Sequence, residues 1–385
     1  MKIRAKMTVV PIIALLVPLI ISVFYIRGFG RFYYERQKGI LYLTIANELV
    51  DGLKQGILSH SDYLNNWIEH SGIKQELEAL PVTQPSEETI RWIEQQWVLL
   101  KESDEPLKSI LSNPMAEQLR MFSRVNPVFA EILLTDRYGR LIAATNPTTD
   151  YWQADEEWWQ AAVEARVLPA GWTRGIQYDE SADVQAMDIS LPIRGPREQL
   201  IGVVKGSLKA SQVLEILAPN PWNEAITRDV FFHDGELVMR LNPPDGSPVP
   251  SRASQKALEL LKDHPETWRS VELFPGTISL AVCVPVSPNE QQVARVTEDQ
   301  MIYVVVHRDR ESAMAPVNQI IHDLTVRGSL LLVVIAILSY LGSTFWFSRP
   351  LKVLHGAAQS MAAHFRTQEE GEIGEASDSL EAVGL

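Results

Sequence analysis

The residues best suited to bind a ligand form a cluster of aromatic side chains with carboxylates between them. Its members are Tyr151, Trp152, Trp158, Trp159, Trp172 and Tyr178. Glu156 lies inside the cluster, in the segment ADEEWW. Aromatic faces attract cations, and a nearby carboxylate supplies the opposite charge. The cluster therefore predicts a small pocket that selects an amine or another cation, although any one of these tryptophans could simply close a protein core.

The common catalytic and nucleotide-binding motifs do not occur in this sequence. It contains no phosphate-binding loop, zinc-protease helix or serine-hydrolase elbow, and the glycines of segment 28–30 lack the third glycine of a dinucleotide fingerprint. His233 and Asp234 could belong to a triad or a metal pair, but an Asp-Gly turn explains both. The acids at 155–157 lack the spacing of a calcium loop. We expect no catalysis, no metal and no cofactor.

Two apolar runs have the length of membrane-spanning helices. Residues 7–26 and 328–347 are each twenty residues long, which at 1.5 Å per residue spans the roughly 30 Å hydrocarbon core. The first run continues into Arg27 without a small-residue cleavage site, so we predict an uncleaved anchor rather than a signal peptide.

The basic residues near these runs predict the orientation in the membrane. Lysines and an arginine occur within residues 1–6, and Arg349 and Lys352 follow the second run. Cytoplasmic flanks carry such an excess of positive charge, so both ends are expected in the cytoplasm. The basic residues between 27 and 38 oppose this assignment, but long loops cross largely regardless of charge. We predict a two-pass protein of the inner (plasma) membrane with residues 27–327 outside the cytoplasm.

The segment between the spans begins with helices and continues with two similar modules. Residues 31–125 have apolar residues at helical spacing, interrupted near Pro81 and Pro85. Residues 126–217 and 228–310 each begin with a hairpin pattern and close with an apolar strand that leads into a helix. We infer an internal duplication, with the Pro-rich residues 218–221 as the linker.

Composition limits the possible partners. The net charge is −13 and no basic stripe occurs, which argues against nucleic acid. The single cysteine, Cys283, excludes an internal disulfide, and its β-like surroundings predict a buried, packed thiol.

Three segments resemble the double Cache sensory domain of bacterial transmembrane receptors. They are residues 128–162, 189–213 and 301–317. The resemblance covers about residues 30 to 325. It implies an α+β fold in which a long N-terminal helix carries a membrane-distal and a membrane-proximal PAS-like module, flanked by two transmembrane helices.

The residues after the second apolar run resemble the first helix of a HAMP linker. Residues 348–365 read SRPLKVLHGAAQSMAAHF, with an apolar seam formed by Leu351, Leu354, Ala358, Met361 and Phe365. Such a seam needs a partner helix, which predicts a parallel homodimer. Residues 368–374 resemble the connector and 378–385 the start of the second helix. Segment 348–385 is therefore expected to be a HAMP-like linker that stops before its end.

The amino-acid-binding branch of the Cache family implies a set of ligand-binding positions. The matching residues here are Tyr151, Glu156, Trp158, Trp159, Tyr178 and Ser207. Glu156 replaces the arginine that would hold a ligand carboxylate, Trp159 replaces a tyrosine, and Ser207 stands near the expected aspartate. We expect these positions to bind an amine or another cation rather than an amino acid.

The function expected from these patterns is that of a non-enzymatic receptor. A small molecule would bind the distal module, and the signal would pass through the second span to the HAMP-like linker and a cytoplasmic signalling partner. Two alternatives are the sensory half of a truncated kinase, cyclase or phosphatase, and an ectodomain that binds only proteins.

Overall fold

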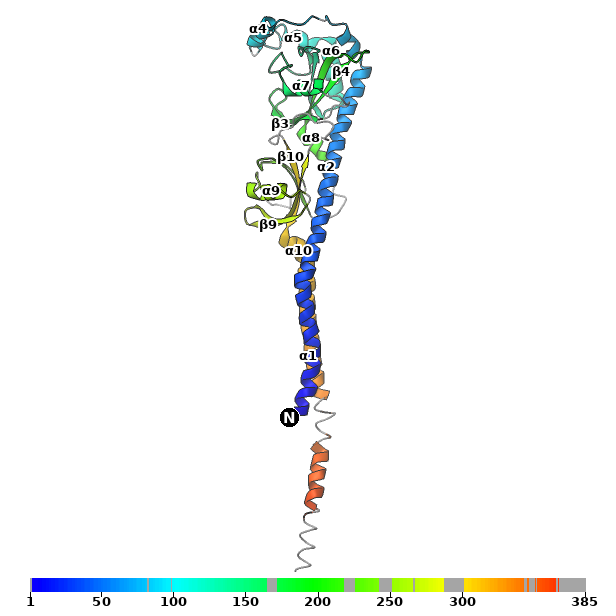
Figure 1. Ribbon diagram of the computed structural model, residues 1–385, viewed down its shortest axis with the longest axis vertical. Coiled ribbons are helices and arrows are strands. Elements are labelled where there is room, and N and C mark those ends of the chain that lie inside the picture. Colours follow the sequence, from blue (N-terminus) through cyan, green and yellow to red (C-terminus); the bar gives the residue numbers. More distant parts are fainter. Residues whose placement is uncertain are drawn as a thin grey trace, which may run out of the picture. The chain divides into compact units, whose positions relative to one another are not determined.

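The computed structural model has two compact units, residues 35–313 and residues 1–34 together with 314–385 (Figure 1). The residues that it describes are 2–81, 83–97, 99–164, 172–217, 226–241, 251–265, 267–286, 301–342, 345, 350, 352–364 and 366. The predicted linker at 218–221 lies outside them.

The larger unit begins with helices. They are α2 (Arg31–His70, of which residues 35–70 belong to this unit), α3 (Ile73–Glu78), α4 (Glu87–Trp97), α5 (Leu107–Ser112) and α6 (Pro114–Val125). In α2, Ile45, Leu49 and Leu53 are buried at steps of four, so one face of the helix packs into the core. The predicted interruption near Pro81 and Pro85 is confirmed, and the Ser86 hydroxyl accepts the Thr89 N–H at 3.2 Å at the start of α4.

The first module is a five-stranded antiparallel sheet. Its strands are β1 (Phe129–Asp136), β2 (Leu141–Ala144), β3 (Trp172–Asp179), β4 (Val184–Arg194) and β5 (Leu200–Lys209), in the order β2-β1-β5-β4-β3. Helices α7 (Glu157–Glu164) and α8 (Ala210–Leu214) accompany it, and a 3₁₀ turn follows at Glu215–Leu217. The predicted hairpin is confirmed: Asp136 accepts the backbone N–H groups of Tyr138 and Arg140, and Gly139 has φ +94°, which favours glycine.

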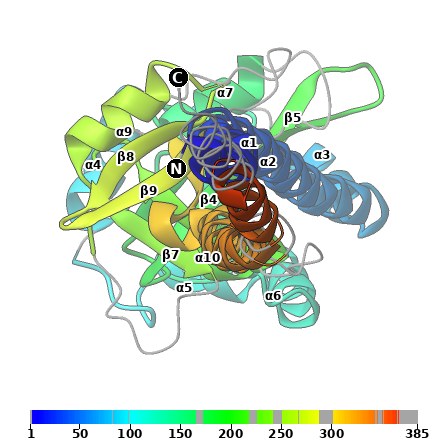
Figure 2. The same ribbon diagram turned by 90° about the horizontal axis from the view of Figure 1, so that it is seen from below.

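The second module repeats this topology. Its strands are β6 (Thr227–Phe232), β7 (Leu237–Leu241), β8 (Arg269–Phe274), β9 (Thr277–Val286) and β10 (Ile302–Asp309), in the order β7-β6-β10-β9-β8. Figure 2 shows its helix α9 (Gln255–Lys262) beside β8 and β9. The same strand order in both sheets confirms the inferred duplication. The fold is α+β, with two tandem modules of the same topology on a long N-terminal helix, which agrees with the fold that the resemblance implies.

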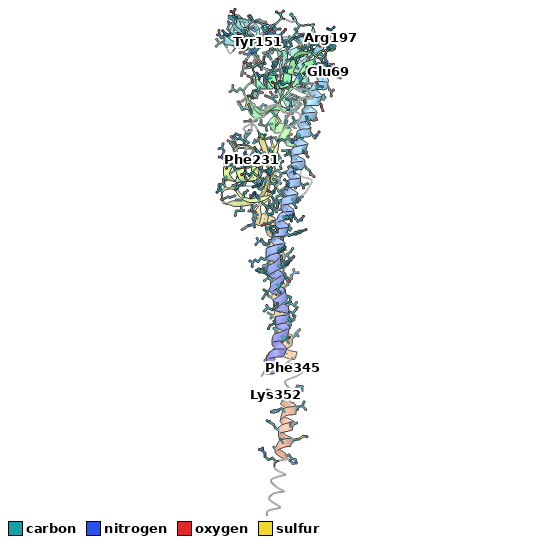
Figure 3. All side chains as sticks on the ribbon, viewed as in Figure 1. Glu69, Tyr151, Arg197, Phe231, Phe345 and Lys352 are labelled. Carbon is teal, nitrogen blue, oxygen red and sulfur yellow. The ribbon has the colours of Figure 1, made fainter. Side chains whose placement is uncertain are left out.

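Helix α2 packs against one face of both sheets. A single apolar cluster contains Leu64 of α2, Ile189 and Val204 of the first sheet, and Val282 and Val304 of the second. Each sheet has a smaller apolar cluster on its other face, to which Tyr151 and Phe231, both labelled in Figure 3, contribute.

Cys283 lies in the smaller cluster of the second module. Its side chain is 1% exposed, and burial raises the pKa of its thiol to about 12. A thiol with this pKa stays protonated at neutral pH and is a poor nucleophile. The prediction of a buried, packed thiol is confirmed.

An ion pair joins helix α2 to the residue that begins helix α10 (Arg310–Gly342). Helix α10 starts directly after β10. The Arg310 Nε donates to Glu35 Oε1 of α2 at 2.8 Å, and Glu35 is 8% exposed. The last strand of the second module is therefore connected to α2 through a charged contact as well as through the core.

The smaller unit contains two helices that are long and apolar enough to cross a membrane. Helix α1 (Lys2–Tyr25) passes through a π-helical turn (Ile26–Gly30) into α2, and the second apolar segment belongs to α10. A Cβ on Gly328 would lie 2.6 Å from Leu19 Cδ1, so the two helices are in close contact at this glycine.

The predicted HAMP-like segment is only partly described. Residues 352–364 are helical, in agreement with the expected first helix, and its seam residues Leu354 and Met361 are exposed. Leu351, Phe365, the predicted connector at 368–374 and the predicted second helix at 378–385 fall outside the described part of the chain.

We expect Gly39→Ala to destabilise the larger unit. A Cβ on Gly39 of α2 would lie 2.0 to 2.6 Å from Trp268, which precedes β8, so the indole or the helix has to move. Overpacking of this kind costs about 1–3 kcal/mol. The matched control is Gly52→Ala in the same helix, where nothing lies within 4 Å of the new Cβ. The control should gain about 0.5–1 kcal/mol, because alanine favours helix. Thermal unfolding of the full chain in detergent measures both, and equal effects would contradict the close contact.

Candidate ligand-binding site

A cavity lies on the face of the first sheet opposite α2. Its volume is about 320 Å³, within the range of roughly 300–1,000 Å³ typical of small-molecule sites. It is lined by Glu131, Leu133, Thr148, Thr149, Asp150, Gln153, Glu156, Trp158, Gln177, Tyr178, Asp179, Glu180, Ser181, Ala186, Asp188 and Lys205. Six of these residues are acids, and Lys205 is the one base among them.

Strand alternation brings the polar residues of the cavity floor to one face of the sheet. Side chains of successive residues point to opposite faces, so Ile132 and Ile189 join the α2 core while their neighbours Glu131 and Asp188 face away from it. The register pairs Ser207 of β5 with Glu131 of β1 on one side and with Asp188 of β4 on the other. One row across three strands therefore carries two acids with a serine between them.

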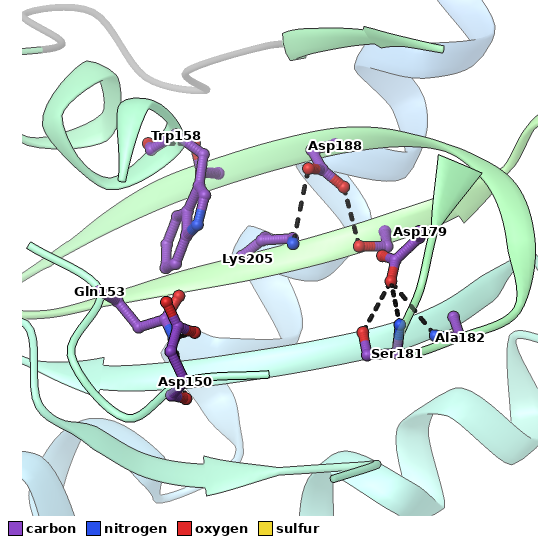
Figure 4. A network of polar contacts seen from close by, with 10 residues as sticks. Asp150, Gln153, Trp158, Asp179, Ser181, Ala182, Asp188 and Lys205 are labelled. Atoms are coloured by element: carbon purple, nitrogen blue, oxygen red, sulfur yellow. Dashed lines mark hydrogen bonds and ion pairs between the residues drawn. The ribbon is translucent and has the colours of Figure 1, made fainter. Parts of the chain in front are cut away.

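Lys205 is held within this floor by an acid and an aromatic ring. Its Nζ lies 3.5 Å from Asp188 Oδ2 and 5.7 Å from the centre of the Trp158 ring (Figure 4). Burial alone would lower the pKa of Lys205, but the carboxylates of Asp188, Glu131 and Asp179 outweigh it and raise that pKa. The ammonium group stays charged and is already committed to neighbours inside the protein.

The acids of the floor and of the adjoining turn differ in how well they are paired. Asp188 Oδ1 accepts the Ser207 hydroxyl at 2.8 Å. Asp179 Oδ1 accepts the Ser181 hydroxyl at 2.6 Å and the N–H groups of Ser181 and Ala182 at 3.1 and 3.2 Å (Figure 4). Burial acts to raise the pKa of Asp179, but these donors and Lys205 lower it overall. Asp179 is therefore anionic.

Glu131 is the acid of the floor with an unmatched oxygen. Its side chain is 1% exposed, and no described residue donates a hydrogen bond to its buried Oε1. Burial raises the pKa of Glu131 to about 7, although the nearby Lys205 ammonium acts in the opposite direction. This carboxyl group therefore exchanges its proton near neutral pH.

The rim of the cavity is a loop held by helix α4. Glu94 Oε1 accepts the backbone N–H groups of Tyr151 and Trp152 at 2.9 and 2.6 Å, and Trp97 Nε1 donates to the Thr148 carbonyl at 3.0 Å. These contacts fix the segment that carries Asp150. Burial raises the pKa of Asp150, even though its Oδ1 accepts the Gln153 amide at 2.6 Å.

Three of the six residues predicted to bind ligand line this cavity. Glu156 lies at the rim, Trp158 is buried against the floor, and Tyr178 is 55% exposed at the mouth, where its hydroxyl donates to Asp183. Trp158 and Trp159 of the aromatic cluster lie in helix α7.

The other three predicted residues are not among those lining the cavity. Tyr151 packs against Trp97, with ring centres 5.3 Å apart. Trp159 Nε1 donates to Thr135 Oγ1 at 3.0 Å, and Ser207 is fully buried. Ser207 still meets a carboxylate, because Asp188 of the adjacent strand occupies the place beside it.

The prediction from sequence missed four residues that line the cavity, namely Glu131, Asp150, Asp188 and Lys205. A signal for three of them is nevertheless present in the strands. Single charged residues interrupt otherwise apolar or small runs, as in FAEILL, QAMDISL and GVVKGSL. A charge in the middle of a buried strand requires a partner or a ligand on the same face, so such interruptions mark candidate site residues.

We expect Glu94→Ala to loosen the rim of the cavity. The substitution removes the acceptor for two backbone N–H groups, which costs about 1–3 kcal/mol when the donors remain buried. Glu94→Gln keeps an acceptor oxygen and should recover most of this loss. Gln95→Ala, at an exposed position of the same helix, is the control for the change in helix composition. Hydrogen exchange at the amides of Tyr151 and Trp152 measures the effect, and unchanged protection in Glu94→Ala would contradict it.

Three solved structures illustrate what the chain is similar to. One is the ligand-binding domain of the Pseudomonas aeruginosa amino acid chemoreceptor PctB in complex with L-Gln, with 18% identity and TM-score 0.35, covering 71% of this chain and 91% of that chain. Another is the ligand-binding domain of the Campylobacter jejuni chemoreceptor Tlp3 in complex with L-valine, with 11% identity and TM-score 0.41, covering 74% and 98%. The third is the extracellular domain of rpHK1S-Z16, described as a histidine kinase, with 12% identity and TM-score 0.39, covering 70% and 94%. No protein-family model and no curated protein sequence matches the chain.

Proposed function

We propose that this chain is a non-enzymatic, membrane-anchored sensory receptor whose first module binds a small organic cation. The observation that carries this proposal is the acidic cavity of about 320 Å³ on the sheet face opposite α2. It is a concave site that combines a buried tryptophan with several convergent polar groups, which is the usual composition of a small-molecule site.

The charge of the cavity favours a cation over an anion. Six lining acids face one lysine, and the ammonium of Lys205 is already engaged by Asp188. An incoming carboxylate would be repelled by the rim acids Asp150 and Glu156 and would find no uncommitted cationic partner among the described lining residues. An ammonium ion gains opposite charges from both the floor and the rim, together with the aromatic face of Trp158.

A ligand in this cavity can influence α2 through the sheet. Asp188 and Lys205 face the cavity, whereas their chain neighbours Ile189 and Val204 pack in the core that contains α2. A small displacement of these strands on ligand binding therefore repacks the helix interface. Such a ligand shifts the equilibrium between two helix arrangements only by the difference in its affinity for them.

The remaining features proposed here concern the membrane and the output. The two apolar helices would cross the inner membrane and place residues 27–327 outside the cytoplasm. The helix at 352–364 would form part of a HAMP-like linker at 348–385 in a parallel homodimer. That linker would then act on a cytoplasmic signalling partner.

Thermal unfolding of the full chain in detergent tests the proposed ligand class. The probes are n-butylammonium, 1,4-diaminobutane and butyrate, which have equal carbon chains and different charges. We expect the two amines to raise the midpoint of unfolding progressively with concentration, because a ligand that binds only the folded state stabilises it. Butyrate should leave the midpoint unchanged. Stabilisation by butyrate without stabilisation by either amine would overturn the proposal.

A pair of neighbouring substitutions separates cavity charge from general charge. Glu156 lines the rim, whereas Glu157 is exposed at the start of α7 and is not among the lining residues. We expect Glu156→Gln to weaken amine binding by roughly three- to tenfold, the effect of removing one partly screened charge near the ligand. Glu157→Gln should change the affinity by less than about twofold. Calorimetric titration of the full chain with 1,4-diaminobutane gives both values, and equal effects would show that the amine binds elsewhere.

A further inference from the structure

One carboxylate oxygen in the cavity lacks the partner that its burial requires. Glu131 lies on the floor of the cavity, and its side chain is only 1% exposed. Its Oε1 receives no hydrogen bond from the described residues. A buried acceptor without a donor costs free energy, and a buried charged one costs more. Glu131 is therefore poised to gain from any N–H donor that enters the cavity.

The neighbouring acids have internal donors instead. Asp188 accepts the Ser207 hydroxyl and faces Lys205, Asp179 accepts three donors from its own turn, and Asp150 accepts the Gln153 amide. A ligand would have to compete with these contacts to bind those acids directly. The Ser181 hydroxyl, which lies near the Glu131 carboxyl group, donates to Asp179. Glu131 Oε1 is therefore an acceptor that a ligand N–H can use without displacing an internal donor.

We propose that Glu131 is the specificity-determining residue of this cavity: its Oε1 accepts an N–H of the ligand's ammonium group, and the ligand binds in exchange for a proton. This inference rests on the proposed function and names the group that selects its ligand. In the exchange, the Glu131 carboxyl group loses its proton to solvent, and the resulting carboxylate pairs with the ammonium ion. No covalent bond other than that O–H changes.

The environment of Glu131 sets the direction of the pH dependence. Lys205 of β5, Asp179 of β3 and Asp188 of β4 face it, and the acids Asp150, Glu156 and Glu180 line the rest of the cavity. The raised pKa of Lys205 and the lowered pKa of Asp179 keep both groups charged at neutral pH. Glu131, whose pKa burial raises to about 7, is thus the floor group that changes charge there.

Ligand affinity should follow the ionised fraction of Glu131. Above its pKa the carboxylate is already formed, so the affinity for an amine is constant as long as the amine itself stays protonated. Below its pKa each unit of pH weakens binding by up to about tenfold, because the proton has to leave first. Proton release per bound ligand correspondingly rises from near zero above the pKa toward one below it.

The first experiment titrates the full chain in detergent with 1,4-diaminobutane between about pH 6 and about pH 8, a range around the pKa of Glu131. We expect the wild type to bind more weakly at the lower pH. Glu131→Gln should lose roughly tenfold or more in affinity at the higher pH and lose the pH dependence. Glu180→Gln removes another lining carboxylate and should bind more weakly while keeping the pH dependence. Equal affinity and equal pH dependence in Glu131→Gln and wild type would overturn the inference while leaving the proposed function intact.

The second experiment does not require a variant that folds. Calorimetry of the wild type in two buffers with different ionisation enthalpies counts the protons released on binding. Release that grows as the pH falls through about 7 supports the exchange at Glu131. Binding without proton release at the lower pH overturns the exchange alone, whereas no binding of any amine at either pH overturns both the inference and the proposed function.

Discussion

The first sheet buries apolar side chains on the face toward α2, whereas its other face buries charged side chains beside a smaller apolar cluster, and the candidate site depends on this difference. The face toward α2 is apolar and contributes Ile132, Ile189 and Val204 to the core. The opposite face carries Glu131, Asp188 and Lys205, which are nearly removed from water. Burying charges is costly unless they are paired, so this face has to be organised around its ions.

The ion cluster compensates for its burial only in part. Lys205 is balanced by Asp188 and by the aromatic face of Trp158, and Ser207 supplies a hydrogen bond to the same aspartate. Glu131 keeps an unmatched oxygen and a pKa raised by burial to about 7. If every buried carboxylate oxygen had a donor within the protein, the ion cluster would serve only the stability or specificity of the fold. Because one oxygen of Glu131 has no such donor among the described residues, the cluster can also bind a ligand.

The second module shows what the same topology looks like when its buried acid is fully paired. Asp229 of β6 accepts Arg240 through Nε at 2.8 Å and through its terminal nitrogen at 2.6 Å, and it lies 3.0 Å from His307 Nε2. Burial acts to raise the pKa of Asp229, but these partners lower it overall. Asp229 lies on the same face of that sheet as the smaller apolar cluster, since Phe231 follows it by two residues and Arg240 lies over the Phe274 ring of that cluster. The two sheets thus differ in how a buried carboxylate is paired: Asp229 has partners within the protein, whereas Glu131 keeps one oxygen without a donor among the described residues.

The sequence by itself determined the features that depend on local spacing. Apolar length predicts the two long apolar helices, turn residues such as Gly139 and Gly235 predict the hairpins, and recurrence of the pattern predicts the duplication. Glu156, Trp158 and Tyr178 were placed near one another for the same reason, since they are close along the chain. Only the tertiary structure decided that Glu131, Asp188 and Lys205 meet. Glu131 lies on β1, far along the chain from Asp188 of β4 and Lys205 of β5. The three side chains share one face of the sheet only when strand order and register are set, because a shift of one residue would turn each side chain to the other face.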